Sequence, residues 1–129
     1  MAAHTELGAW GEALIVEMFR QVGIEAQRGG PADLLIEGGI ALEVKTAKPS
    51  KYDGKHSGFQ FCIDRAGHTS LKAAAVILVC VGDAGPEFFI IPAREVGNRR
   101  KLGVGVDLAE YKGRWAAFRD KWDVIAEVA

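Results

Sequence analysis

An acid and a lysine two positions apart, Glu43 and Lys45, carry the clearest chemical signal in this sequence. An acid-x-Lys triplet alone is a weak motif, because a chain with 17 acids and eight lysines should contain about one by chance. This chain contains three, at 43–45, 53–55 and 110–112. Only the first lies in a strand-like segment, where alternation of side chains places Glu43 and Lys45 on the same face.

A second acid, Asp33, opens the preceding strand-like segment, 33–37, and the segment 40–46 follows after Gly38-Gly39. The two glycines are a strong signal for a tight hairpin, which would bring the carboxylates of Asp33 and Glu43 close together. Two hard oxygen ligands beside a lysine suit Mg²⁺, which takes one or two carboxylates and several waters. The alternative is a solvated strand face, with Asp33 only ending a turn.

A third acid, Glu12, is embedded in an apolar part of the first helical segment. Its neighbours three and four residues away are Gly8, Ala9, Ile15 and Val16, all apolar or small. A buried charge without a partner is costly, so this carboxylate requires one. The partner is either an arginine in a core ion pair or the metal ion that the other two acids would bind.

The elements that must position these residues follow from the hydrophobic pattern. A helix is expected over 6–22, capped by Thr5 and ended by Gly23. The other expected elements are a strand at 24–28, the hairpin, a polar loop at 47–58, a strand at 59–63, a short helix or turn at 65–72, strands at 76–81 and 87–91, the second stopped by Pro92, and a helix at about 114–128. This order predicts one α/β domain over 1–129, with a mixed central sheet flanked by helices.

Composition narrows the class of protein. The net charge of −1 excludes a globally basic nucleic-acid binder but not a locally basic one. The longest apolar run, 73–81, is shorter than the roughly 20 residues needed to cross a bilayer, and the N-terminus has no features of a signal peptide. A cytoplasmic protein without a membrane partner is expected. Cys62 and Cys80 lie in apolar strand-like runs and are expected to be buried free thiols, as in a reducing compartment.

In combination and order, Gly11-Glu12 on the first helix, Asp33 opening a strand and Glu43-Val44-Lys45 on the next resemble the PD-(D/E)XK nuclease superfamily. That superfamily has the restriction-endonuclease-like fold. One departure is Ala32, which separates Pro31 from Asp33. The later segments 59–61, 76–81 and 88–92 look like the small stand-alone members, including group I intron homing endonucleases and Holliday junction resolvases.

The resemblance implies a metal-dependent endonuclease that hydrolyses phosphodiester bonds of duplex or branched DNA. Asp33, Glu43 and the backbone carbonyl of Val44 would hold Mg²⁺, with Mn²⁺ as a substitute and no small-molecule cofactor. The metal would activate water and stabilise charge on the phosphate. Lys45 would orient that water or stabilise the developing negative charge.

Two further residues have open roles. Glu12 would bind a second metal ion or order the waters around the first. Gln60 is a weaker catalytic candidate, because similar nucleases often carry a glutamine near the site, and its alternative is a solvated strand residue between Phe59 and Phe61. The alternatives for the whole chain are a non-catalytic nucleic-acid-binding domain that keeps the nuclease fold, and a structural or interaction protein.

Basic residues near the proposed site suit contact with DNA phosphates. The loop 45–56 contains Lys48, Lys51 and Lys55 beside one acid, and Arg99-Arg100-Lys101 form a second basic cluster. The alternative for both groups is a solvated charged surface. Because one domain of this kind has one site and two strands must be cut, a homodimer or homotetramer is expected.

Overall fold

A five-stranded mixed sheet forms the centre of the computed structural model, which describes residues 2–29, 32–51, 57–63 and 72–128. Its strands, in the order in which they lie side by side, are β1 (Ala26–Arg28), β2 (Leu34–Ile36), β3 (Ile40–Ala47), β6 (Ala75–Gly82) and β7 (Gly85–Pro92). β3 and β6 are parallel, and the other neighbours are antiparallel. The predicted mixed sheet is therefore confirmed.

A second, three-stranded antiparallel sheet and three helices complete the fold. The sheet contains β4 (Ser50–Lys51), β5 (Ser57–Cys62) and β8 (Lys101–Gly105), and the helices are α1 (Ala2–Gln21), α2 (Ala93–Val96) and α3 (Asp123–Glu127). Two short 3₁₀ helices, η1 (Leu108–Glu110) and η2 (Ala116–Phe118), lie between β8 and α3. In the described part of the chain, no helix is both long and apolar enough to span a membrane.

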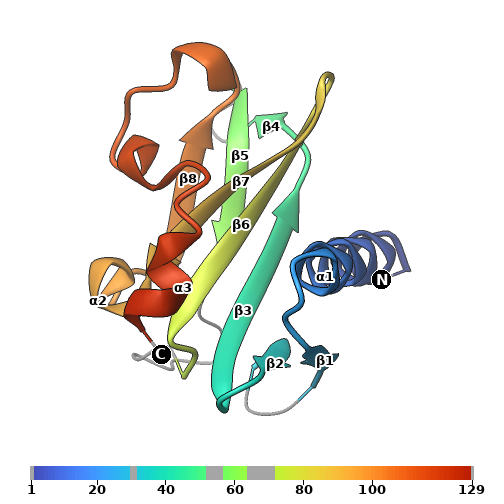
Figure 1. The fold of residues 1–129 in the computed structure, drawn as a ribbon. Helices are drawn as coiled ribbons and strands as arrows, with labels where there is room; N and C mark the ends of the chain where they lie inside the picture. Colours follow the sequence, from blue (N-terminus) through green and yellow to red (C-terminus); the bar gives the residue numbers. More distant parts are fainter. Residues whose placement is uncertain (1, 30–31, 52–56, 64–71, 129) are drawn as a thin grey trace.

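The two faces of the central sheet are covered by different elements (Figure 1). On one face, Ile15 and Phe19 of α1 and Val124 and Ile125 of α3 form a buried cluster with side chains of β2, β3, β6 and β7. On the other face, the inward side chains of β5 and β8 form a second buried cluster. β6 lies between the clusters, and residues 75–80 are all buried, as expected for its continuous apolar run.

The hairpin of β2 and β3 is present as predicted. Gly38 and Gly39 have φ of 87° and 79°, a backbone region that residues with a side chain rarely adopt. Ile36 pairs with Ile40 and Leu34 with Leu42. Continued by one residue, this register places Asp33 opposite Glu43.

Helix α1 approaches β3 closely at Gly11. A Cβ added to Gly11 would lie 1.8 Å from Thr46 Oγ1, so the absence of a side chain is what permits this contact. Thr46 Oγ1 is buried and has no hydrogen-bond partner within the described residues. The Gly11–Thr46 contact fixes the distance at which the neighbouring Glu12 lies from β3.

The predicted C-terminal helix over 114–128 is wrong. The segment contains η2 and α3, separated by a turn in which Asp120 has a φ of 50° and Arg119 forms a bridge with Phe89 of β7. The reason is that its apolar residues serve different cores: Trp115 is buried beneath the three-stranded sheet, whereas Ile125 is buried on the α1 face. One straight helix cannot reach both faces of a sheet.

Other differences are smaller. α1 begins at Ala2, so Thr5 lies inside the helix and is not its N-cap. Strands β4 and β8 and helix α2 were not predicted. Strand β4 lies within the expected polar loop 47–58. The predicted strands are present with ends within two residues of the expected ones, and the helix or turn expected at 65–72 lies almost entirely outside the described residues.

The cysteine prediction is half right. Cys80 is a buried free thiol, and burial, followed by the charge of Glu87, raises its pKa to about 12. Cys62 is exposed, because it lies on β5 with Gln60 and faces away from the core that Phe59 and Phe61 enter. The apolar run around Cys62 has only one buried face.

Candidate active site

The structure brings Asp33 and Glu43 together at the start of the hairpin. Glu43 and Lys45 are half-buried on one face of β3, whereas Leu42 and Val44 are buried on the other. Asp33 Oδ2 accepts a hydrogen bond of 2.9 Å from the backbone N–H of Val44, and the carboxyl groups of Asp33 and Glu43 are hydrogen-bonded to each other. The predicted meeting of the two acids and the shared face of Glu43 and Lys45 are confirmed.

The environment of Glu43 favours its protonated form. Burial is the largest cause, followed by the hydrogen bond and the negative charge of Asp33, and together they raise the pKa of Glu43 from 4.5 to about 7. The ammonium group of Lys45 acts in the opposite direction, and Glu12 adds a further raising effect. Near neutral pH the carboxyl group of Glu43 is therefore protonated for part of the time.

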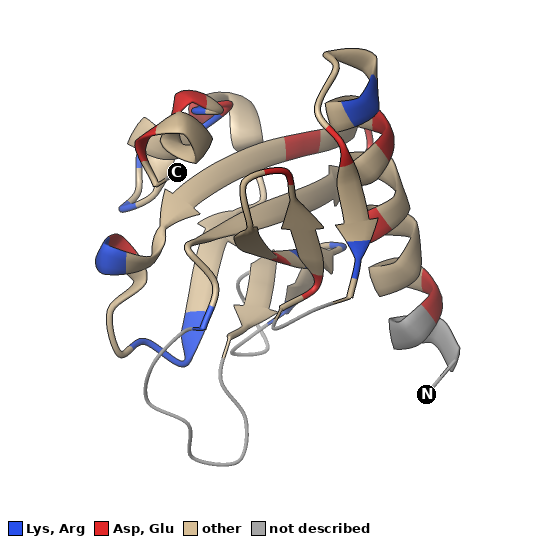
Figure 2. Ribbon diagram, turned by 60° about the horizontal axis from the view of Figure 1, so that its bottom comes forward, with Lys and Arg blue, Asp and Glu red and all other residues tan. Residues whose placement is uncertain are grey.

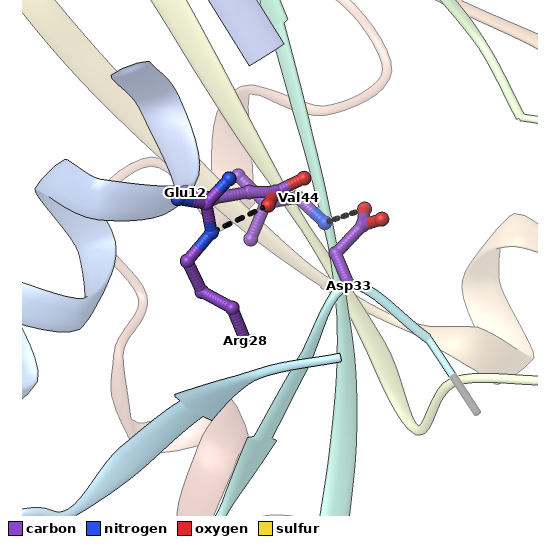
Figure 3. Close-up of polar contacts among 4 residues, drawn as sticks. All are labelled: Glu12, Arg28, Asp33 and Val44. Atoms are coloured by element: carbon purple, nitrogen blue, oxygen red, sulfur yellow. Dashed lines mark hydrogen bonds and ion pairs between the residues drawn. The ribbon is translucent and has the colours of Figure 1, made fainter. Parts of the chain in front are cut away.

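Glu12 contacts Arg28, a residue of β1. Arg28 Nε lies 3.1 Å from Glu12 Oε1, and the side chain of Glu12 is only 21% exposed (Figure 3). In Figure 3, Glu12 and Asp33 lie on either side of Val44. The ion pair with an arginine, one of the two partners expected for Glu12, is thus present. The Glu12 carboxylate is also close enough to Glu43 to raise the pKa of Glu43.

Arg28 is the residue of this site that the sequence did not single out. It pairs with Leu34 in the sheet, and the N–H of the next residue, Gly29, donates a hydrogen bond of 2.9 Å to the carbonyl of Asp33. The available signal was its position at the start of the predicted turn 28–31, five residues before Asp33. That signal did not identify Glu12 as its partner.

The donors at this site fit Mg²⁺ better than a metal that requires a closed protein cage. Within the described ranges, no three His, Cys, Asp or Glu side chains form a group that could hold a metal ion. Asp33 and Glu43 nevertheless supply two hard oxygen ligands, and Mg²⁺ commonly keeps several waters. The N–H and C=O of a strand residue point to the same edge, so the carbonyl of Val44 faces the side on which Asp33 lies.

Gln60 lies apart from these residues. It is exposed on β5, on the face opposite the buried Phe59 and Phe61, and lines a shallow depression of about 390 Å³ with Lys101 and Gly103. No hydrogen bond to Asp33 or Glu43 is found among the described residues. This position corresponds to the solvated strand residue that was its alternative.

The predicted DNA-binding residues occupy separate surfaces. Lys48 and Lys51 are exposed at and after the end of β3, and Lys55 lies outside the described residues. Arg99 and Arg100 are exposed before β8, but Arg99 also donates hydrogen bonds to the backbone carbonyls of residues 95 and 96 and lies 5.5 Å from the ring centre of Trp115. In the ribbon of Figure 2, the Lys and Arg positions of the described residues are spread over several separate segments.

Comparison with known proteins supports the fold. No protein-family model and no curated protein sequence matches the chain. A solved structure of a bacterial homing endonuclease, I-Ssp6803I, is similar, with a TM-score of 0.64 and 15% sequence identity over 94% of this chain and 89% of that chain. The α/β architecture with a mixed central sheet flanked by helices is therefore an endonuclease-like fold.

Proposed function

We propose that this protein is a metal-dependent DNA endonuclease of the PD-(D/E)XK type. The observation that carries the proposal is the pair of hydrogen-bonded carboxyl groups of Asp33 and Glu43 with Lys45 on the same strand face. The fold shared with a homing endonuclease adds support, since it is the setting in which such a site would act on DNA.

In this proposal Asp33, Glu43 and the carbonyl of Val44 hold Mg²⁺, and Mn²⁺ can replace it. When bound, the ion lowers the pKa of a water molecule and stabilises negative charge on the scissile phosphate. Asp33 also accepts a hydrogen bond from the N–H of Val44. This bond holds two proposed ligands, the Asp33 carboxylate and the Val44 carbonyl, in a fixed position relative to each other. Lys45 places a compact positive charge beside Glu43, where it stabilises the charge that develops on the phosphate.

For Glu12 we propose the role of ordering water around the ion. Its Oε1 atom is bonded to Arg28, which leaves Oε2 to accept hydrogen bonds from water. For Gln60 the exposed position on the small sheet favours a contact with DNA over a catalytic role.

The test is cleavage of supercoiled plasmid DNA with Mg²⁺, Mn²⁺ or EDTA. Asp33→Ala, Glu43→Ala and Lys45→Ala should each reduce the rate by about 10²- to 10³-fold, as is typical when one electrostatic stabiliser is removed. Asp83→Ala is a matched control, because Asp83 is exposed in the turn between β6 and β7, away from the site.

Cleavage that continues in EDTA, or an Asp33→Ala protein that cuts at the normal rate, would refute the proposed site. DNA binding by the wild-type protein without cleavage under any of these conditions would instead favour the non-catalytic nucleic-acid-binding domain.

The proposed assembly is a homodimer or homotetramer that binds duplex or branched DNA. Each chain has one candidate site, so cleavage of two strands in concert requires at least two chains. Light scattering at micromolar concentration measures the assembly directly, and a strict monomer with and without DNA would contradict it.

A further inference from the structure

Arg28 uses its guanidinium group differently from Arg119 and Arg99. Arg119 donates to Glu87 and to the carbonyl of Leu108 and lies over the ring of Phe89. Arg99 uses Nη1 for backbone carbonyls. Arg28, in contrast, uses Nε for Glu12, and within the described part of the chain neither of its Nη atoms has a hydrogen-bond partner.

The free donors of Arg28 are accessible to a ligand. Its side chain is 50% exposed, and a guanidinium group carries five N–H donors in a rigid planar fork. Because Glu12 holds Nε, the plane of the group is fixed while its outer edge, with both Nη atoms, remains available. A planar edge of two nitrogens suits bidentate binding of two oxygens of a phosphate group.

Arg28 is linked to the candidate metal ligands through its chain neighbour and through its ion-pair partner. Gly29, the next residue, donates its N–H to the carbonyl of Asp33, and Glu12, the partner of Arg28, is close enough to Glu43 to raise its pKa. The site thus contains three acids, and a phosphate that approaches them meets repulsion. Lys45 offers one point charge against this repulsion, and Arg28 offers a second charge with a directional edge.

We propose that Arg28 is a phosphate-binding residue of this site, with its Nη atoms bound to a phosphodiester group of the DNA and its orientation set by Glu12. The inference rests on the proposed function, because it takes DNA as the substrate. Glu12 is then a positioning residue for Arg28, in addition to any effect that it has on water near the metal ion.

The experiment is the salt dependence of DNA binding, measured by fluorescence anisotropy with a labelled 30-base-pair duplex in EDTA, so that no cleavage occurs. Arg28→Ala should weaken binding by about tenfold at moderate salt, as for one charge-assisted contact. The slope of log K against log salt should also fall by about one. Arg28→Lys should keep the slope, because the charge remains, but should not recover the full affinity, because the fork is lost.

Arg20→Ala is the matched control. Arg20 forms a comparable ion pair, 2.8 Å from Glu17, but lies 70% exposed on the outer side of α1. The Arg20→Ala variant loses the same charge as Arg28→Ala, but away from the site. Its affinity for DNA and its salt slope should therefore equal those of the wild type. Circular dichroism shows whether each variant is folded. If Arg28→Ala does not fold, the affinity of Arg28→Lys tests the proposal.

A double-mutant cycle with Glu12→Gln tests the positioning role. Arg28→Ala should cost less affinity in the Glu12→Gln protein than in the wild type, because the guanidinium is no longer held in place. If the wild type binds DNA in a salt-dependent way and Arg28→Ala changes neither the affinity nor the salt slope, the inference about Arg28 is overturned and the proposed function stands. A wild-type protein that shows no salt-dependent binding of DNA would overturn both.

Discussion

Replacement of Glu43 by glutamine should stabilise the metal-free protein at alkaline pH. The pKa of Glu43 is raised, so the stability that its protonated form contributes is fully present below about 4.5 and is lost as the pH rises through about 7. Glutamine does not titrate, and its amide can donate to Asp33 as the protonated carboxyl group does. The variant should therefore keep at pH 8 the stability that the wild type has only in acid.

The magnitude follows from the pKa of Glu43. The difference between about 7 and the ordinary 4.5, at about 1.36 kcal/mol per pKa unit, gives an upper limit of about 3.4 kcal/mol. Glu43 is only half-buried, so screening by water reduces the expected free energy to about 1–2 kcal/mol. For a domain of this size, that corresponds to about 3–10 °C in melting temperature.

The assay is thermal unfolding in EDTA at pH 5 and pH 8, followed by circular dichroism. Glu43→Gln should melt close to the wild type at pH 5 and clearly above it at pH 8. Glu110→Gln is the control, because Glu110 belongs to another acid-x-Lys triplet but is exposed in η1. The same difference between Glu43→Gln and wild type at both pH values would refute the argument that the carboxyl pair is destabilised by ionisation.

Three other predictions concern the proposed metal ligands, the contact between α1 and β3, and the proposed DNA-binding surface. Mg²⁺ at pH 8 should raise the melting temperature of the wild type more than that of Glu43→Gln, since only the wild type offers both carboxylates, and equal increases would contradict the proposed ligands. Gly11→Ala should destabilise the protein by about 1–3 kcal/mol, because the new Cβ would overlap Thr46 Oγ1. In chemical denaturation, adding Thr46→Ala should recover part of this loss. If the effects of the two substitutions on the free energy of unfolding are strictly additive, the contact is not the cause. Lys51→Ala should lower the salt slope of DNA binding by about one while leaving cleavage per bound complex unchanged, and a loss of cleavage at saturating protein would contradict a pure phosphate contact.

Local patterns were sufficient for the strands that carry the site. Alternation placed Glu43 and Lys45 on one face of β3, and Gly38-Gly39 placed Asp33 opposite Glu43, because each of these relations is set by residues close in the chain. The continuous apolar run of β6 likewise predicted burial on both faces. The superfamily, the metal ion and the assembly stay proposals.

Only the tertiary structure decided the surroundings of these strands. The ion pair between Glu12 and Arg28 depends on how α1 lies against the sheet, and that distance depends on the absence of a side chain at Gly11. The periodicity of 114–128 predicted one helix, but its apolar residues divide between two cores, and no local pattern shows which face of a sheet a side chain will meet. The sequence by itself thus determined which residues lie on one strand face, because side-chain alternation is a property of the backbone; packing between distant segments decided their partners, because it depends on the shapes of surfaces that form only when the chain folds.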